Sequence, residues 1–419
     1  MKILAIETSC DDTGIAIIEI SDKKQETNFK VLSNIVSSQT IHQQYGGVFP
    51  MMAKREHQAN LVPVLKEALQ KAKLLKIQKG TSSAPATKIK NQNDNAKLKI
   101  LEKILKKESD LYKNLTKFLE KYKKPFDHDQ GKPVIDAIAV THGPGLEPCL
   151  WVGVNFAKAL SYFWKIPVIP VNHIEAHILV NWLKPINENS KPKIKNPKQI
   201  QNPKSKIQNL FPAVSLVVSG GHTQLILMKK IGKYKIIGET RDDAAGECFD
   251  KAAKILGLGY PGGPIISEIA FKANNPPQPI KLPRPMINSK DYDFSFSGLK
   301  TAILYAAKDN VLTEKYIEEM CTEIQQAILD VLIKKTIKAA KDFKVKTIIL
   351  GGGVSANQEL RKQFASKLQI VNSQINLLIP PKELSTDNAL MIAIAGYFHK
   401  NKKASWKNLE ANANLRVGK

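Results

Sequence analysis

The chain has 419 residues, of which 43% are hydrophobic, and its formal net charge is +25 at pH 7. This length predicts two or three domains, each with enough apolar residues for a substantial core. No apolar run reaches the ~18–20 residues of a membrane span, and MKILAIETSCDDTG turns acidic too early for a signal peptide. The four cysteines lie far apart without a C-x-x-C pair, which disfavours disulfides and a cysteine zinc site. We therefore expect a cytoplasmic protein that does not bind a membrane.

The first predicted element is a pair of strands joined by a polar turn, in KILAIETSCDDTGIAIIEI (residues 2–20). Ile3, Leu4 and Ile6 stand before the turn, and the apolar run 15–18 stands after it. Polar residues and a glycine between the two runs are typical of a turn, so this segment predicts strand, turn and strand.

Two lysine-rich stretches carry most of the positive charge. Residues 71–125 hold 16 lysines against 5 acidic residues, a net charge of +11, and residues 184–210 hold 7 lysines against 1 acidic residue, a net charge of +6. We expect helical pieces around 97–122, after a loop at 80–94. Both stretches are poor in aromatic residues, so we interpret them as insertions or linkers with a solvated surface. A contact with nucleic-acid phosphates stays open as the alternative.

The middle of the chain alternates strands with a helix. VIDAIAVTHGPGL (134–146) reads as a buried strand that enters a Gly-Pro-Gly loop, and WVGVNFAKALSYFWK (151–165) has apolar residues at helical spacing. IPVIPV (166–171) is a short strand that leads into the histidine segment PVNHIEAHILVNW (170–182).

The second half repeats the opening plan. FPAVSLVVSGGHTQLILMKKIGKYKIIGET (211–240) predicts a strand, a polar turn, a strand and one further strand. A long amphipathic helix is expected at 317–343, a strand at 346–353 and a helix at 354–368. Strands that alternate with helices indicate an α/β fold, and two strand–turn–strand units suggest an internal duplication.

The chain is accordingly divided into two lobes. We predict an N-terminal lobe at 1–183 with a lysine-rich insertion at about 71–130, and a C-terminal lobe at 212–419. Residues 184–211, rich in lysine, asparagine and proline, form the predicted linker or insertion between them.

Three glycine-rich loops follow apolar segments, at 217–223 (VVSGGHT), 260–264 (YPGGP) and 351–353. Glycine loops at helix N-termini suit a phosphate or carboxylate, because backbone N–H groups and the helix dipole point at the ligand. Each loop alone could be a plain tight turn, since none has the lysine of a P-loop or the spacing of a dinucleotide fingerprint. Together they predict one cleft between two lobes that holds a nucleotide.

His173 and His177 are the candidate metal ligands. Residues four apart share one face of a helix, so both imidazoles can reach one ion. Glu175 is about 200° around the helix from His173, which rules out a zincin-type protease on geometry. Spacing alone leaves a metal site and two structural histidines as open alternatives.

A metal site here needs a third ligand. The candidates are His142, His222, Asp11, Asp12 and Asp387, and the residue pattern does not choose among them.

The motifs taken together are distinctive. IETSCDDTG, YGGVFP, GPGL, NHIEAHI, LVVSGGHTQL, DDAAGECFDKAAKILGLGYPGGP, PRP, DFSFSGLKTA, GGGVSANQELR and STDNALMIA occur in this order. The chain resembles the bacterial-type tRNA N6-adenosine threonylcarbamoyltransferases, the TsaD members of the Kae/Qri family, over most of its length outside 71–130 and 184–210.

The resemblance implies a fold and a reaction. The fold is a two-lobed, actin-like ATPase architecture of the hexokinase/Hsp70 type (ASKHA), with duplicated lobes around a central cleft. The reaction moves the threonylcarbamoyl group of L-threonylcarbamoyladenylate to N6 of the adenosine 3′ of the anticodon, in tRNAs that read codons beginning with A. AMP is released.

The resemblance also implies site residues. His173, His177 and Asp387 would bind one divalent metal, Fe²⁺ first and Zn²⁺ as the alternative. Substrate-binding positions map onto Val217, Val218, Ser219, Gly220, Gly221, Asp250, Gly263 and Asn357. Asp11 is a candidate for a direct catalytic role. One departure from the family is Ala389, where glycine is usual after Thr-Asp-Asn; it would matter only if that backbone needs a positive φ.

The implied partners are tRNA, a paralogous dimerisation partner and a small P-loop ATPase. Two other readings remain. A small-metabolite kinase of the same fold would use ATP and would not need two histidines on one metal. A non-catalytic nucleic-acid-binding protein would keep its activity without His173 and His177 and would bind with a steep salt dependence.

Overall fold

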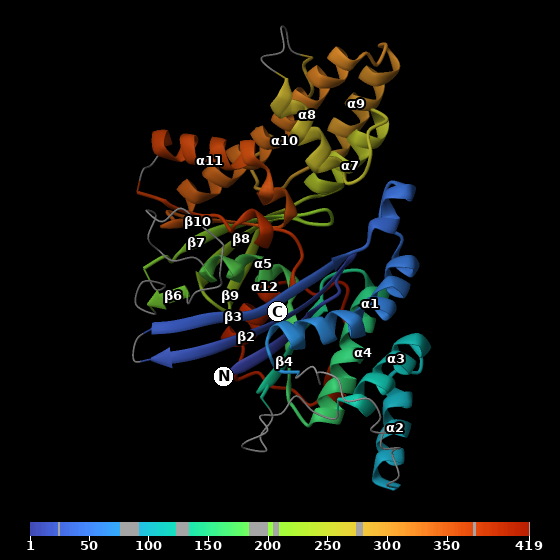
Figure 1. The fold of residues 1–419 in the computed structure, drawn as a ribbon. Helices are drawn as coiled ribbons and strands as arrows, with labels where there is room; N and C mark the ends of the chain where they lie inside the picture. Colours follow the sequence, from blue (N-terminus) through green and yellow to red (C-terminus); the bar gives the residue numbers. More distant parts are fainter. Residues whose placement is uncertain are drawn as a thin grey trace. The chain divides into compact units, whose positions relative to one another are not determined.

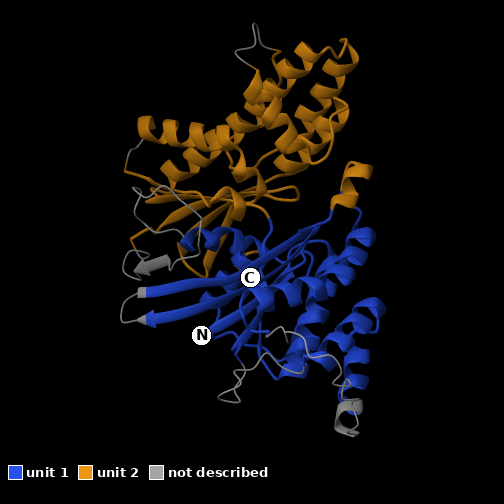
Figure 2. Ribbon diagram, viewed as in Figure 1, with its two compact units in different colours: residues 1–39, 48–204, 387–416 blue, residues 40–47, 205–386, 417–419 orange. Residues whose placement is uncertain are grey.

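The computed structural model describes residues 1–23, 26–75, 92–122, 134–183, 200–203, 209–273, 280–371 and 374–418. The chain forms two compact units, coloured separately in Figure 2. Unit 1 comprises Met1–Gln39, Val48–Lys204 and Asp387–Arg416. Unit 2 comprises Thr40–Gly47, Ser205–Thr386 and Val417–Lys419.

Unit 1 is built on a six-stranded sheet in the order β5-β4-β1-β2-β3-β6. Its strands are β1 (Lys2–Glu7), β2 (Asp12–Lys23), β3 (Glu26–Ser38), β4 (Ala137–Gly143), β5 (Val168–Asn172) and β6 (Ile200–Pro203). The first three strands form an antiparallel meander, whereas β4 and β5 run parallel to β1 on its other side. The two strands predicted at the N-terminus are therefore β1 and β2, and the sequence did not reveal β3.

Helices cover both faces of this sheet (Figure 1). The helices are α1 (Pro50–Lys71), α2 (Gln92–Ile104), α3 (Ser109–Lys121), α4 (Glu147–Trp164), α5 (His173–Leu179) and α12 (Ala389–Phe398), with 3-10 turns at Thr40–Tyr45, in unit 2, and Val180–Leu183. Successive side chains of a strand point to opposite faces of the sheet. Leu4 and Ile6 of β1 point to the face covered by α1 and α4 and belong to the hydrophobic core there. On the opposite face α12 packs so closely that a Cβ on Gly396 would lie 2.7 Å from the Cβ of Ala139.

The described part of the lysine-rich stretch at 71–130 contributes to this core. Leu101, Leu105, Leu111, Leu115 and Leu119 of the α2–α3 segment are fully or almost fully buried in the unit 1 cluster. The leucines recur at helical spacing while the lysines occupy the other face, so these helices are amphipathic. The helices predicted around 97–122 are thus present, and they are packed elements of unit 1.

Unit 2 is built on a five-stranded sheet in the order β11-β10-β7-β8-β9. Its strands are β7 (Ala213–Val218), β8 (Thr223–Lys230), β9 (Lys233–Glu239), β10 (Thr347–Gly351) and β11 (Asn376–Leu378). Its helices are α7 (Ala245–Ile255), α8 (Gly262–Lys272), α9 (Ser297–Lys308), α10 (Glu314–Asp342) and α11 (Gln358–Val371), with 3-10 turns at Gly353–Ala356 and Lys382–Leu384. The helix predicted at 317–343 is α10, but it is not amphipathic as predicted, because its central part is buried nearly all round.

The two sheets share one connectivity. In each, the first strand pairs antiparallel with the second and the second with the third, while the fourth and fifth lie parallel on the other side. This repeat is the plan of the actin-like, hexokinase/Hsp70-type ATPases. The predicted α/β fold with duplicated lobes is confirmed.

The division of the chain differs from the predicted lobes at two places. Asp387–Arg416 belongs to unit 1 and not to a C-terminal lobe, because α12 packs on β1 and β2. Thr40–Gly47 belongs to unit 2. The predicted linker at 184–211 lies outside the described residues except at 200–203 and 209–211, and the predicted loop at 80–94 lies outside them except at its end. Among described residues, no helix is long and apolar enough to cross a membrane.

Candidate functional site

The histidine segment forms a short helix directly after a strand of the unit 1 sheet. β5 ends at Asn172, whose side-chain oxygen accepts a hydrogen bond of 3.0 Å from the backbone N–H of Glu175 and so caps α5. His173 is the first residue of this helix and His177 follows one turn later. Their rings stand edge to face with centroids 4.6 Å apart, so the predicted shared helical face is present.

Asp387 reaches the same place from the far end of the chain. It precedes Asn388, whose side-chain oxygen caps α12 by accepting from the N–H of Met391 at 3.1 Å. Ala389 is the first residue of that helix and is absent from the described non-glycine residues with positive φ. The departure from glycine at Ala389 therefore introduces no backbone strain.

Three ligand atoms converge at this point. The carboxylate oxygen Oδ1 of Asp387 lies 3.1 Å from Nε2 of His177 and 3.6 Å from Nε2 of His173. Two ligands that each lie about 2.1 Å from one ion are at most about 4.2 Å apart, so these distances fit a shared cation. Among the described residues this is the one group of three that could hold a metal. Two imidazoles and one carboxylate form a donor set that suits a divalent transition metal and leaves positions open for substrate.

The histidines are deeply buried, and Glu7 and Ser9 lie behind His173. His173 is 4% exposed and His177 is fully buried. Nδ1 of His173 is 3.4 Å from Oε2 of Glu7 and 3.2 Å from Oγ of Ser9. Glu7 has no predicted role in the sequence, although a charged residue at the end of an apolar strand is a signal that could have identified it.

The electrostatics of the centre favour a cation. Burial lowers the pKa of His173, but the carboxylates of Asp387 and Glu7 outweigh burial and raise it to about 9. The pKa of His177 is lowered, because burial and the neighbouring His173 outweigh the hydrogen bond to Asp387. Carboxylates that attract a proton to His173 attract a divalent ion for the same reason.

Of the other proposed third ligands, none joins this cluster. His142 lies with Nδ1 3.3 Å from the carbonyl oxygen of Glu410, and His222 lies in unit 2. Asp11 and Asp12 lie in the turn after β1 and at the start of β2. Burial raises the pKa of Asp12 to about 7, and the charges of Asp387, Asp11 and Glu7 add to that effect. Both acids therefore belong to the acidic surroundings of the centre.

Glu175 points away from the metal candidates, as the helical geometry required. Its Oε2 lies 2.7 Å from Nε2 of His399, which follows α12. This pair ties α5 to the end of α12, and Glu175 has no place in the ligand group.

The predicted substrate-binding residues of unit 2 lie at the end of β7, in the turn that follows it, within α7 and α8, and directly before α11. Val217 and Val218 end β7, and Ser219–Gly221 turn the chain into β8. The turn is closed by the N–H of Ser219, which donates to the carbonyl of His222 at 2.8 Å. A Cβ on Gly220 or Gly221 would meet no atom within 4 Å, so packing does not require glycine at either position.

Two other glycines hold neighbouring backbones against this turn. Gly352 has φ +85°, and a Cβ there would lie 2.3 Å from the carbonyl oxygen of Val218. A Cβ on Gly246, in the first turn of α7, would lie 2.5 Å from the carbonyl oxygen of Ser219. The end of β7, the start of α7 and the loop after β10 are therefore in direct backbone contact.

Asp250 and Asn357 cap two helices of the same loop group. Oδ1 of Asp250 accepts from the N–H of Gly262, the first residue of α8, at 2.7 Å. Oδ1 of Asn357 accepts from the N–H of Leu360 at 2.9 Å, and its amide group donates to Gln325 at 2.7 Å. Gly263 follows Gly262 in the first turn of α8.

The cap on α8 makes a stability prediction. Replacing Asp250 by alanine leaves the N–H of Gly262 without its acceptor and is expected to cost about 0.5–2 kcal/mol of the free energy of unfolding of unit 2. Asp250→Asn keeps an oxygen at the same place and should remain close to wild type. Chemical denaturation followed by circular dichroism measures both. Equal losses for the two variants would show that the charge of Asp250, and not its hydrogen bond, stabilises the helix.

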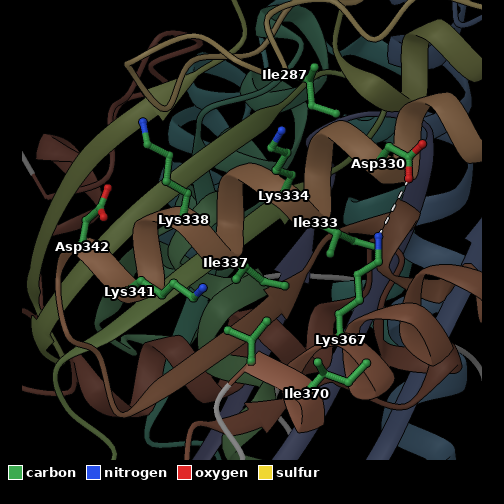
Figure 3. A pocket seen from close by; sticks show the side chains of 11 residues that line it. Ile287, Asp330, Ile333, Lys334, Ile337, Lys338, Lys341, Asp342, Lys367 and Ile370 are labelled. Carbon is green, nitrogen blue, oxygen red and sulfur yellow. Dashed lines mark ion pairs between the residues drawn. The ribbon is translucent and has the colours of Figure 1, made fainter.

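Unit 2 also contains a separate hollow of about 470 Å³ between α10 and the end of α11. Figure 3 shows the side chains that line it. Isoleucines form its apolar part, and Lys334, Lys338, Lys341 and Lys367 stand around it. None of the predicted substrate-binding residues lines this hollow.

Comparison with known proteins agrees with these features. The model of the family TsaD, tRNA N6-adenosine threonylcarbamoyltransferase, matches residues 30–78, 113–195 and 199–394. A protein of Thermosipho africanus with that name is 40% identical over 423 residues, covering 100% of both chains. Another with that name, from Porphyromonas gingivalis, is 37% identical and covers 94% of this chain and 92% of its own length.

A solved structure was also found. Full-length HypF in its phosphate- and nucleotide-bound form aligns with 71% of this chain and 42% of its own chain, at 13% identity and a TM-score of 0.45. The family match and the full-length relatives decide the assignment. This chain belongs to the family of the tRNA N6-adenosine threonylcarbamoyltransferases, transferases that modify tRNA.

Proposed function

We propose that this protein transfers the threonylcarbamoyl group of L-threonylcarbamoyladenylate to N6 of the adenosine 3′ of the anticodon, in tRNAs that read codons beginning with A. The N6 nitrogen forms a bond to the carbamoyl carbon and loses one proton. The bond from that carbon to the phosphate oxygen breaks, and AMP leaves with the bonding electron pair.

The observation that carries the proposal is the convergence of His173, His177 and Asp387 in a member of this family. An ion bound there would supply Lewis acidity and a template for an oxygen of the donor. The donor set accommodates Fe²⁺ or Zn²⁺, and we propose Fe²⁺ as the native ion. Asp11, beside this acidic centre, is the candidate for a direct catalytic role.

We assign the adenylate part of the donor to the loops of unit 2. Helix N-termini and a Ser-Gly-Gly turn offer backbone N–H groups to phosphate oxygens. The proposed contacts are Val217, Val218, Ser219, Gly220, Gly221, Asp250, Gly263 and Asn357. Since Asp250 and Asn357 already cap α8 and α11, their proposed role includes holding these loops in place.

The proposed partners are tRNA, a paralogous protein that dimerises with this one, and a small P-loop ATPase, all in the cytoplasm. The net charge of +25 favours association with an anionic partner such as tRNA.

A transfer assay tests the proposal. The purified protein, with its partner proteins, is given L-threonylcarbamoyladenylate and an unmodified tRNA that reads codons beginning with A. Mass spectrometry of the digested nucleosides measures threonylcarbamoyladenosine. The matched control is the same tRNA with guanosine at the position 3′ of the anticodon.

Modified adenosine in the first tRNA and none in the control is the expected result. Absence of the modified nucleoside with every partner combination, together with ATP-dependent phosphorylation of a small metabolite, would instead identify a kinase of the same fold.

A further inference from the structure

Glu7 is a fully buried carboxylate at the end of β1. Burying a carboxylate without partners costs several kcal/mol, so we expect hydrogen-bond partners that compensate this cost. These partners indicate the role of Glu7. The N–H of Ser9 donates to Oε1 at 2.6 Å, and the hydroxyl of Thr141 donates to Oε2 at 2.5 Å. The remaining hydrogen-bond contact of Oε2 is Nδ1 of His173, at 3.4 Å.

These contacts favour one position for the proton of a neutral His173. An unprotonated carboxylate oxygen only accepts hydrogen bonds, so a hydrogen bond between Oε2 of Glu7 and Nδ1 requires the proton on Nδ1. A neutral imidazole with its proton on Nδ1 has its lone pair on Nε2. Nε2 is the atom that faces Asp387, at 3.6 Å, in the ligand group.

We propose that Glu7 is a positioning residue for the metal centre, which fixes the tautomer and ring orientation of His173 so that Nε2 is ready to bind the ion. A carboxylate behind a ligating histidine orients the ring and raises its basicity. Glu7 and Asp387 also place two carboxyl groups near the proposed ion, whose ionised forms would balance the charge of one divalent cation. The inference rests on the proposed metal site.

The strand end that carries Glu7 is held rigidly. The hydroxyl of Thr8 donates to the carbonyl of Cys149 in α4 at 3.0 Å. A Cβ on Gly153, also in α4, would lie 2.2 Å from this hydroxyl oxygen, so only glycine permits the contact. A positioning group needs such a rigid support.

His177 provides the internal contrast. Its Nδ1 is buried and has no hydrogen-bond partner among the described residues, while its Nε2 lies 3.1 Å from Asp387. No carboxylate among the described residues lies against Nδ1 of His177. The two ligands are therefore held differently, and loss of Glu7 should act on His173 alone.

The first test uses the wild-type chain. In the Zn²⁺-loaded protein labelled with ¹⁵N-histidine, NMR should show the proton of His173 on Nδ1 and the metal on Nε2. A proton on Nε2 of His173 would overturn the proposal whether or not any variant folds. Failure of the wild type to bind Zn²⁺ or Fe²⁺ at all would instead overturn the proposed metal site on which this inference rests.

The second test is Glu7→Gln, with Zn²⁺ affinity measured by competition with a chromophoric chelator. The NH₂ of the glutamine side chain can only donate, so when it occupies the place of Oε2 it forces Nδ1 of His173 to accept and moves the proton to Nε2. The expected loss of Zn²⁺ affinity is about 10–100-fold. When its imidazole is neutral, His173 of the metal-free variant should carry its proton on Nε2.

Ser9→Ala is the matched control. It removes the hydroxyl that lies 3.2 Å from Nδ1 but keeps the backbone N–H that donates to Glu7. A smaller loss than in Glu7→Gln is expected. Wild-type Zn²⁺ affinity in a folded Glu7→Gln protein, or equal losses in the two variants, would refute the role of Glu7.

Discussion

Replacing His173 and His177 together by alanine is expected to abolish metal binding and to reduce threonylcarbamoyl transfer by at least about 100-fold. The variant removes two of the three candidate ligand atoms and leaves only the carboxylate of Asp387. A single carboxylate does not retain a transition metal against water, and loss of one preorganised electrostatic group already costs about 10²–10³ in rate. Metal content by mass spectrometry and modified nucleoside per enzyme measure the two effects.

His142→Ala is the matched control, since His142 is a histidine of unit 1 that the structure leaves outside the ligand group. It should keep wild-type metal content. A folded double variant that still transfers at the wild-type rate would keep the family assignment and remove the metal from the mechanism.

The second large effect is expected from Gly352→Ala in unit 2. A side chain at φ +85° is strained, and its Cβ would lie 2.3 Å from the carbonyl oxygen of Val218. The backbone must shift, at an expected cost of about 2–4 kcal/mol. For a unit of this size that lowers Tm by roughly 5–15 °C. Differential scanning calorimetry measures the shift.

Gly220→Ala is the control for this substitution, because it lies in the adjoining turn with no atom within 4 Å of the new Cβ. Its unfolding free energy should stay within about 0.5 kcal/mol of wild type. If Gly352→Ala were equally harmless, the close contact between the loop after β10 and the end of β7 would not exist in solution.

Much of the fold could be predicted because its strands are short apolar runs bounded by turn residues. The segment 211–240 gave β7, β8 and β9, and the run IPVIPV gave β5. The alternating strand β3 has polar residues on its open face and was missed. The strand predicted at 346–353 is β10, which ends two residues earlier, at Gly351. The following helix begins at Gln358 and not at 354, because a 3-10 turn and the cap at Asn357 come first.

The assignment of α12 to unit 1 could not have been predicted. Its sequence ALMIAIAGYF is apolar on every side, so periodicity does not indicate which sheet it covers. The position of α12 depends instead on packing between residues far apart in the sequence. Gly396 lies close to Ala139, and Gly14 lies close to Ala389.

The same limit applies to the metal centre. The helical pair of histidines follows from a local spacing, whereas Asp387 lies 210 residues beyond His177. Five residues were equally acceptable as the third ligand from the sequence alone. Only the packing of α12 on unit 1 brings one of them, Asp387, to the histidines. Glu7 was overlooked because a lone acid in a strand–turn motif has many roles.

The discontinuity of unit 1 has a consequence for biosynthesis. His173 and His177 emerge from the ribosome before any of the unit 2 sheet, but Asp387 emerges after all of it. A nascent chain folds its N-terminal parts first, at about 5–20 residues per second. Unit 1 therefore cannot be completed until unit 2 has been synthesised. Until then, the face of its sheet that α12 covers lacks this helix. The candidate metal-binding group is therefore complete only late in synthesis, and a chain truncated before Asp387 cannot form it.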